Sequence, residues 1–551
     1  MRAVCIAILA CSVPTTGLLS AQEKPERPRV GVTGPERRLT LEDAIQQALG
    51  SNLQIEIERT NVDTAAQIIK AAQGVFDPVF RYRPSLETRN TPTPNVLISP
   101  TGTLTERIHR EDFSLQKLTP WQGLSLSANF DNARQSTNNP FIGLNPFLET
   151  RLTFGISMPL VRGREIDPAR AQIKVRSKQR EVSETELALR VIEVVTQVQN
   201  AYWNLVAARR ERDVRADGVA LGREQLARSQ RQIESGTLAP VELAAAEAEL
   251  QRRIDSYMAS VNAVTQAENG LKLLLAGSRE DALWSEELSP VDARTLEPSV
   301  KELGEAVRTG LSKRPELQAV RLLTEANDVQ ATLARDRRKP QVNLVAGYST
   351  AGLSGTINAA PNPFEGLNAP LNNRVDQLSV LAGLPPLPGG AFPGPPERFL
   401  GGYGRALSNL GGGSYYTVQG GIQLEWNLRN RTADAELAQT AIAERRLKLQ
   451  MRQAEQGVEA EVRNALQALE SASARIEAAQ ASERAAQEKL ESEIRLFQTG
   501  ESTNFLVLTR QNELLDSRLR AVIAVLEYNR AVARLEQATG LTLEAHRISL
   551  N

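Results

Sequence analysis

The sequence predicts a mostly helical protein: two copies of a long helical hairpin, accompanied by a small set of amphipathic β-strands. The first observation is an apolar seam with alternating steps of four and three, as in a coiled coil, at Leu187, Val191, Val194, Val198, Ala201, Leu205 and Ala208. The second is a repeat of this seam 264 residues later, at Val458, Val462, Ala465, Leu469 and Ala472. The third is a change of the apolar period to two between the helical regions. The chain is therefore a tandem duplication of one unit.

Composition excludes some functions. The 551 residues contain 65 Lys and Arg and 65 Asp and Glu, so no excess of positive charge favours nucleic acid as a partner. Aromatic residues make up only 4%, and Ala, Glu, Gln, Arg and Leu dominate, which is typical of long helices.

Residues 1–21 are expected to form a secretory signal peptide, since an apolar run precedes a small-residue site at Leu19-Ser20-Ala21. A lipoprotein signal with lipidation of Cys11, after Ile8-Leu9-Ala10, is the alternative, and export follows from either. Cys5 and Cys11 are the only cysteines, so no disulfide framework is expected. No later stretch reaches about 18 apolar residues, so no transmembrane helix is expected. Residues 22–38 are Pro-rich and charged, and we expect a flexible segment or one that lies along a neighbour.

The first unit is expected at 39–277. Thr40 and Asp43 form a capping-box pattern before a short helix, and a second helix starts near Leu53. Strands are expected within 79–161, where apolar and polar residues alternate. The region 78–131 is longer than one membrane crossing needs and leaves room for an extra hairpin. Asp167-Pro168 then starts the long hairpin 167–275, whose tip is at Gly236.

The second unit is expected at 300–541, after a linker at 278–299 in which Trp284 packs against the helices. Its strands are expected within 341–428, around a long surface loop at 351–414 that is rich in Gly, Pro and Asn. The second long hairpin covers 431–540 with its tip at Gly500, where glycine suits a left-handed conformation. Residues 542–551 form a C-terminal tail.

The alternating strands fit either a membrane barrel with a wet lumen or a half-buried sheet in a soluble sandwich. The exported context and the flanking aromatic residues favour the membrane. Two units supply about four membrane strands, which cannot close a barrel. Open sheet edges are not tolerated in lipid, so several protomers must share one barrel that the helices continue as a tube. A conduit follows from this geometry.

The chain resembles the outer-membrane efflux protein family, the TolC-like channels, over about 39–541. The resemblance rests on the duplication and on six short motifs: Arg314-Pro315-Glu316-Leu317, Met158-Pro159-Leu160-Val161-Arg162-Gly163, Trp426-Asn427-Leu428-Arg429, the tips Glu234-Ser235-Gly236 and Gln498-Thr499-Gly500, and Glu536-Gln537-Ala538-Thr539-Gly540. It implies a homotrimer in the outer membrane, with a twelve-stranded β-barrel and a periplasmic α-barrel of twelve helices. It also implies that the helical tips dock onto a periplasmic adaptor and an inner-membrane pump, of RND or ABC type. The tip residues are Gly236, Thr237, Leu238, Pro240, Gly500, Glu501, Ser502 and Thr503.

The sequence departs from the family after the second tip. Many members carry aspartates there that ring the closed periplasmic mouth, whereas this chain has Leu506 and Thr509, next to Phe505. One hypothesis is an apolar constriction made by Phe505 and Leu506, which can gate by dewetting. The alternative is that both are seam residues. Glu242, at the equivalent place in the first unit, could supply charge instead.

No motif indicates an enzyme, a cofactor or a metal site. His109 and His546 are the only histidines, and neither has the spacing of a metal-binding pair. The alternative functions are a type I protein secretion duct, which sequence cannot separate from small-molecule efflux, and an exported coiled-coil scaffold that forms no channel.

Overall fold

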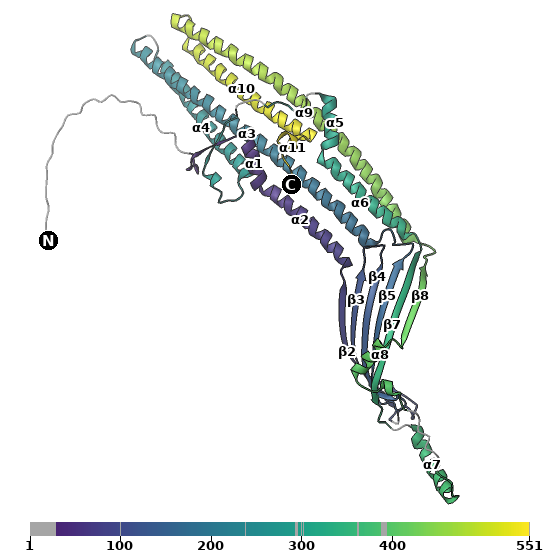
Figure 1. Ribbon diagram of the computed structural model, residues 1–551. Helices are drawn as coiled ribbons and strands as arrows, with labels where there is room; N and C mark the ends of the chain where they lie inside the picture. The colour runs from purple at the N-terminus through teal and green to yellow at the C-terminus, as the bar shows by residue number, and fades with distance from the viewer. Residues whose placement is uncertain are drawn as a thin grey trace, which may run out of the picture.

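A computed structural model describes residues 29–99, 101–236, 239–292, 296–298, 300, 302–360, 363–386 and 394–549. The expected signal peptide and Cys11 lie outside the described residues. The molecule is elongated: long helices form one end, strands continue from them, and a separate helix extends beyond the strands (Figure 1).

The helices are α1 (Leu41–Ser51), α2 (Leu53–Gln73), α3 (Pro168–Glu234), α4 (Val241–Leu275), α5 (Leu303–Lys313), α6 (Pro315–Arg337), α7 (Pro363–Leu381), α8 (Tyr403–Gly411), α9 (Arg431–Thr499), α10 (Asn504–Thr539) and α11 (Thr542–Ala545). The strands are β1 (Glu36–Leu39), β2 (Val79–Pro92), β3 (Thr103–Leu118), β4 (Ser125–Thr137), β5 (Leu144–Pro159), β6 (Glu287–Pro290), β7 (Gln341–Ile357) and β8 (Tyr416–Glu425). Short 3-10 turns lie at Gly74–Phe76, Ala282–Trp284 and Glu397–Phe399.

The long helices lie side by side in a layer four helices wide. Next to the sheet, contacts place them in the order α2, α3, α6, α9; near the tips the order is α4, α3, α10, α9. α3 and α9 span both levels because they contain 67 and 69 residues, which corresponds to about 100 Å each at 1.5 Å per residue. The expected pair of very long hairpins is confirmed.

Local sequence signals start and stop these helices where the sequence predicts. The Thr40 side chain accepts a hydrogen bond from the Asp43 N–H, and the reciprocal capping-box bond is present. Asp167 caps α3 by accepting from the Arg170 N–H at 2.8 Å, with Pro168 in the first helical position. Gly540 ends α10 with φ +72°, a conformation that favours glycine.

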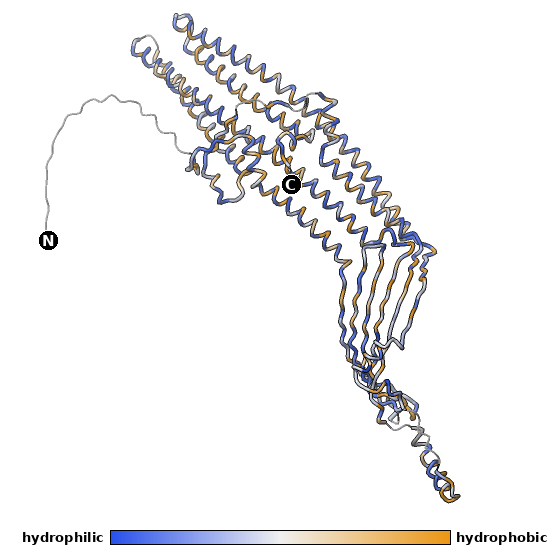
Figure 2. The backbone as a smooth tube through the Cα atoms, viewed as in Figure 1, coloured by the Kyte–Doolittle hydropathy of each residue, from blue (hydrophilic) through white to orange (hydrophobic). Residues whose placement is uncertain are grey.

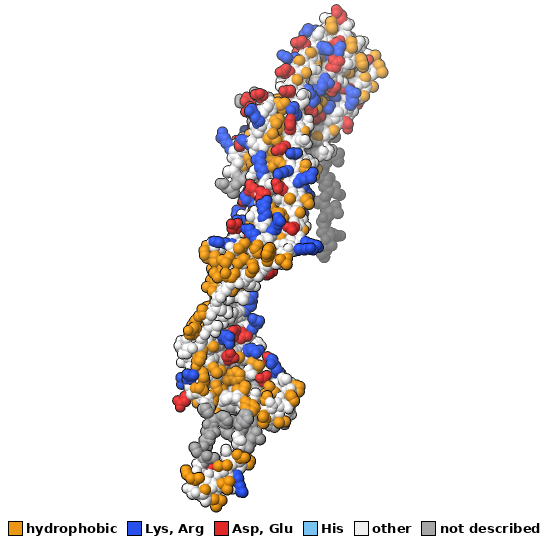
Figure 3. Space-filling model, turned by 90° about the vertical axis from the view of Figure 1, so that its right-hand side faces the viewer, with side chains coloured by type: hydrophobic (Ala, Val, Ile, Leu, Met, Phe, Trp, Pro, Cys, Tyr) orange, Lys and Arg blue, Asp and Glu red, His pale blue; other side chains and the backbone are white. Residues whose placement is uncertain are grey.

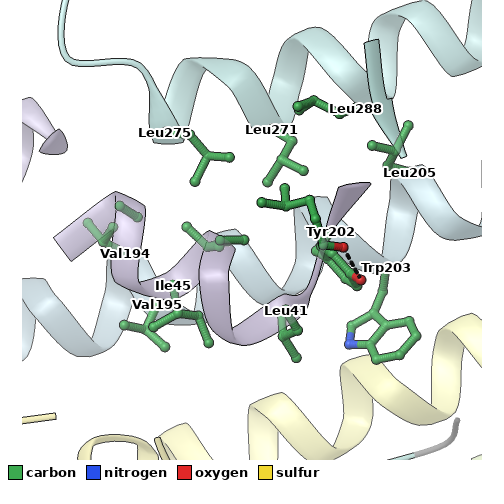
Figure 4. Close-up of a cluster of buried hydrophobic side chains, with 14 of the residues drawn as sticks. Leu41, Ile45, Val194, Val195, Tyr202, Trp203, Leu205, Leu271, Leu275 and Leu288 are labelled. Atoms are coloured by element: carbon green, nitrogen blue, oxygen red, sulfur yellow. Dashed lines mark hydrogen bonds between the residues drawn. The ribbon is translucent and has the colours of Figure 1, made fainter. Parts of the chain in front are cut away.

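The predicted seams form the hydrophobic core. Val191, Val194, Val198 and Leu205 are fully buried in one cluster with α1 and α4 (Figure 4). The second seam, from Val458 to Ala472, is buried in a separate cluster with α5 and α10. Burying apolar side chains stabilises the fold by about 1.5–3 kcal/mol for each large residue, so these seams dominate the packing energy.

Residues 29–39, which precede the first helix, lie along the linker of the same chain. β1 pairs in parallel with β6 in the linker, from Glu36 with Glu287 to Leu39 with Pro290. Beneath this pair, the buried Lys272 ammonium lies 2.8 Å from Glu268, which in turn pairs with Arg29 at 2.6 Å. Lys272 also donates to the Trp284 and Glu286 carbonyls. The linker is thus held against α4, and Trp284 packs against the core as expected.

The main sheet contains six strands where about four were expected. Its order is β2-β3-β4-β5-β7-β8, and all neighbours are antiparallel. The extra hairpin is β2–β3, within 78–131. Its alternation was hidden in the sequence because β2 and β3 carry arginine and glutamate on one face over most of their length. The edges β2 and β8 have no partner strand among the described residues.

The two faces of this sheet differ in polarity. The apolar face carries exposed aromatic and aliphatic side chains, including Phe80, Leu115, Phe154, Leu344 and Ile422. On it Phe113 stacks on Tyr82 with ring centroids 4.8 Å apart. The polar face carries the residues that alternate with these along each strand, among them Arg81, Asp112, Asp131, Arg151 and Gln423. Hydropathy alternates along the strands accordingly, and hydrophobic side chains gather on the sheet where it meets the helices (Figures 2 and 3).

The expected long surface loop at 351–414 is only partly a loop. β7 continues to Ile357, α7 extends away from the sheet, and α8 packs across the apolar face of β5 and β7. Gly352 permits this approach, because a Cβ there would lie 2.0 Å from the Ala406 carbonyl oxygen. The composition of 351–414 predicted a loop because glycine and proline residues interrupt the helices of this region. The tail likewise contains α11, and His546 lies 2.7 Å from Gln199 of α3.

Tyr202 provides a test of the core. Its hydroxyl donates to the Leu39 carbonyl at 3.0 Å and lies 2.8 Å from Asp292, so Tyr202→Phe should lower the stability by about 1–3 kcal/mol. Burial, followed by the Asp292 hydrogen bond, raises the pKa of Tyr202. The neutral phenol therefore stabilises the fold below about pH 10, where unfolded tyrosine is also neutral, and this contribution falls as pH rises further.

Thermal unfolding followed by circular dichroism should show a difference in stability between the wild type and Tyr202→Phe that shrinks above that pH. Tyr528→Phe is the control, and an equal effect there would contradict the assignment.

Candidate functional site

The candidate site is the end of the helical layer farthest from the sheet, where both hairpins turn. In the second hairpin Gly500 has φ +83°, and the Glu501 N–H donates to the Leu496 carbonyl at 2.9 Å. The Thr503 hydroxyl caps α10 by accepting from the Leu506 N–H. Ser502 donates to Glu493, which also lies 3.6 Å from Arg510. This turn is therefore closed by its own polar side chains, while Glu501 is exposed to solvent.

The first hairpin turns less tightly. Ser235 ends α3 and Gly236 follows with φ +73°. α4 begins at Val241, and its N-cap residue is Pro240. This helix start has no capping hydrogen bond from a side chain, because the proline ring carries no polar group. The expected docking residues Thr237 and Leu238 lie outside the described residues. Gly236 and Pro240 are exposed, as docking would require.

Buried polar side chains join the two tips. Asn504, at the start of α10, accepts from Gln225 of α3 and donates to Glu242 of α4 at 3.4 Å. Asn504 and Gln225 are both almost fully buried. Glu242, a candidate pore charge, therefore has its carboxylate at the contact between the hairpins and is only partly exposed.

Arg253 of α4 forms the larger link between the hairpins. Its guanidinium is 6% exposed and donates to the Gly218 carbonyl at 3.1 Å, Gln511 at 3.2 Å and Asn512 at 3.0 Å. It also pairs with Glu249 at 2.9 Å. A buried charge is tolerated only when its donors are satisfied, so the two hairpins must hold this relative position for Arg253 to be stable.

Phe505 and Leu506 point away from the contacts within the chain. Phe505 is 72% exposed and Leu506 is 37% exposed, whereas the buried positions of this turn are Asn504, Val507 and Gln511. Neither side chain packs in the apolar interior of its own hairpin, because α10 turns other residues inward. Thr509, one turn later, is half-buried and donates to the Phe505 carbonyl.

Other site types find no support in the part of the chain that is described. Within it, no three or more His, Cys, Asp or Glu side chains are grouped so that they could hold a metal ion. Across the same residues, none of the helices combines the length and the apolar character needed to span a bilayer.

Sequence comparison identifies the family. Residues 123–277 and 397–541, more than half of the chain, match the outer membrane efflux protein family. The chain belongs to this family. The efflux protein is thus placed in the outer membrane, in a family of passive channels that serve efflux systems together with adaptors and pumps. None of the curated protein sequences matches it.

Solved structures show the same fold. The outer-membrane channel OprN superimposes with a TM-score of 0.60 at 15% identity, covering 91% of this chain and 89% of that one. CusC gives 0.60 at 16% identity, with 91% and 92% covered. The outer membrane protein VceC of Vibrio cholerae gives 0.58 at 14% identity, with 91% and 96% covered. The predicted fold class is confirmed.

Sequence reasoning missed the polar links of the efflux protein, although α3 carried a signal for them. Gly218 and Gly222 lie one turn apart inside a helix, where glycine costs stability. A Cβ at Gly222 would lie 3.2 Å from Leu250 and 3.3 Å from Arg253, and one at Gly218 would lie 3.1 Å from Leu515. Glycine within a helix often marks such a close approach.

The Arg253 link can be tested by removing its charge and donors. Arg253→Met should let the tips separate, because Gln511, Asn512 and the Gly218 carbonyl lose a shared partner. Spin labels at Glu234 and Thr499 should then report longer and broader distances. Arg252→Met is the matched control, since Arg252 is exposed and pairs with Glu249 on its own helix. Unchanged distances in Arg253→Met would show that the hairpins are held by apolar packing alone.

Proposed function

We propose that the efflux protein is a passive trimeric conduit from the periplasm to the exterior, and that it docks through its helical tips onto a periplasmic adaptor and an inner-membrane pump. The observation that carries this proposal is the six-stranded sheet with an apolar face and two edges that have no partner strand in the described part of the chain. Unpaired backbone groups are costly in lipid, so the edges need partner strands from other copies. β2 runs away from the helices and β8 returns toward them, so β8 of one copy can pair antiparallel with β2 of the next.

Six strands per chain change the expected barrel. Three copies of six strands make eighteen, in place of the twelve that the family resemblance implied. The width of the sheet, compared with that of the helical layer, supports eighteen strands. Six strands spaced about 4.8 Å and tilted about 40° cover about 38 Å of circumference. Four helices side by side cover about 40 Å at about 10 Å each, so strand and helix tubes can join without a step.

The tips are the proposed docking surface. The described tip residues Gly236, Pro240, Glu501 and Thr503 are exposed at the end of the layer, and Thr237 and Leu238 lie between the first two in sequence. The polar links from Asn504 and Arg253 hold the two tips together as one surface that an adaptor can contact. A type I secretion duct would use the same surface, since the adaptor and pump select the cargo.

Cross-linking between edge strands tests the conduit. Gln423→Cys on β8 is combined in one chain with Arg81→Cys, Arg83→Cys or Ser85→Cys on β2, all on the polar face. One of these pairs should form disulfides between copies, because directly opposed strand residues have Cβ atoms about 5 Å apart. Non-reducing gels should show a ladder that ends at the trimer. Gln423→Cys with Phe80→Cys, on opposite faces, is the control. A monomer band in every combination would exclude a shared barrel and favour the non-channel scaffold.

The exposed Phe505 and Leu506 are proposed to form an apolar constriction at the periplasmic mouth, with Thr509 one turn behind them. Leu506→Asp should raise cation selectivity and introduce block by divalent ions in planar-bilayer recordings, because a carboxylate would then line the pore. Leu496→Asp is the control, since Leu496 is similarly exposed at 40% but lies on α9. If selectivity and divalent block in Leu506→Asp match the wild type, Leu506 does not face the pore.

A further inference from the structure

Beyond the apolar side chains of the sheet, toward the loops, the apolar face carries three basic residues. Arg107 and His109 lie on β3 and Arg134 lies on β4, in the halves of these strands farthest from the helices. We call Arg107, His109 and Arg134 the outer basic patch. His109 and Arg134 are directly opposite each other in the strand register, and Arg107 follows two residues away on the same face. The three side chains therefore form one group.

The outer basic patch lies beside Leu86 and is separated from the aromatic rows by Glu111 and Asn132 on the same face. Phe113 and Phe130 are paired across the same two strands, four residues closer to the helices, which is about 13 Å along a strand. Leu86 of β2, which is 79% exposed, lies opposite His109. Apolar and basic side chains thus meet at Leu86 on the outside of the sheet.

The arginines of the patch differ from those of the polar face. On the polar face Arg89 pairs with Glu87 at 2.6 Å, and Arg110 pairs with the same carboxylate at 3.3 Å. Arg107 and Arg134 are exposed and make no ion pair or side-chain hydrogen bond with any residue that the structure describes. His109 lies 3.7 Å from Glu111, the only carboxylate that the described strands place on this part of the face. Two guanidinium groups are therefore free to bind a ligand.

One side of the patch is bounded by α8. Its Tyr403 hydroxyl donates to Asn132 at 2.8 Å, and Asn132 precedes Arg134 by two residues on the same face. The patch thus lies in a corner between α8 and the open surface of β2 and β3. An elongated ligand could lie in this corner with an anionic end beside the arginines and an apolar part on the aromatic rows.

We propose that the outer basic patch binds the phosphate groups of a phosphorylated glycolipid in the outer leaflet of the membrane. Guanidinium groups bind phosphate oxygens in a bidentate manner, and two of them lie at the level where the apolar rows end. Acyl chains would contact Leu86, Phe113 and Phe130. Free phosphate satisfies the same donors but leaves the apolar rows unused, which favours the lipid. The proposal rests on the outer-membrane location and the lipid-facing role of the apolar face, and not on efflux.

Lipid binding by the purified, detergent-solubilised full chain tests this proposal. Native mass spectrometry with bis-phosphorylated lipid A as the probe should show a bound lipid in the wild type. The double variant R107Q/R134Q should bind it about tenfold more weakly, which corresponds to about 1.4 kcal/mol. The matched control is R81Q/R89Q, which removes the same charge from the polar face and should stay within about twofold of the wild type. Equal loss in both double variants would overturn the assignment to this patch.

Measurements on the wild type alone keep the proposal falsifiable if the double variant does not fold. Lipid A without its phosphates should bind about tenfold more weakly than the bis-phosphorylated form. Excess inorganic phosphate should displace only part of the bound lipid, because it cannot replace the acyl contacts. Binding that does not depend on the lipid phosphates would overturn the proposal. Complete displacement by inorganic phosphate would assign the patch to the free anion instead of a lipid.

Discussion

The structure depends on the continuous apolar seam of α3. This one helix contacts α2 and α6 near the sheet, α1 in the middle, and α4 and α10 toward the tips. Its buried side chains change with these neighbours, from Val191 and Leu205 in the middle to Gly218 and Gly222 where Leu515 and Arg253 approach. Because α3 spans every level, the two duplicated units are joined along their whole length. The linker strand β6 and the first strand β1 pack against the same core and also help to hold the two units together.

Polar contacts take over where the apolar seam ends. Toward the tips the buried residues include Gln225, Ser229, Arg253, Asn504 and Gln511. Apolar surfaces can slide past each other with little change in energy, whereas hydrogen bonds between buried groups require one register. The contact between the two hairpins near the tips is thus fixed in register by polar groups, while the buried apolar cluster at this level lies within the second hairpin, between α9 and α10.

The sheet is adapted to two surroundings at once. Its apolar face is suited to lipid, and on its polar face arginine and carboxylate side chains pair with each other. α8 covers the apolar face only at the outer end of β5 and β7, where Gly352 and Thr150 leave room for it. The rest of that face at the outer end carries the outer basic patch. The side chains of one sheet thus form a polar face, an apolar belt and a basic outer border.

Sequence alone determined the helical hairpins, because the 3.5-residue seam and the glycine turns are local signals that repeat 264 residues apart. It also predicted the caps at Thr40 and Asp167, since a cap depends on neighbouring residues. The tertiary structure alone decided the number of strands, because the charged β2–β3 hairpin shows its apolar face only when it is paired in register. It also decided which side chains near Gly500 turn outward and which of the buried polar groups meet between the hairpins. Such contacts join residues more than 250 positions apart, as Arg253 and Gln511 do, and no local pattern encodes them.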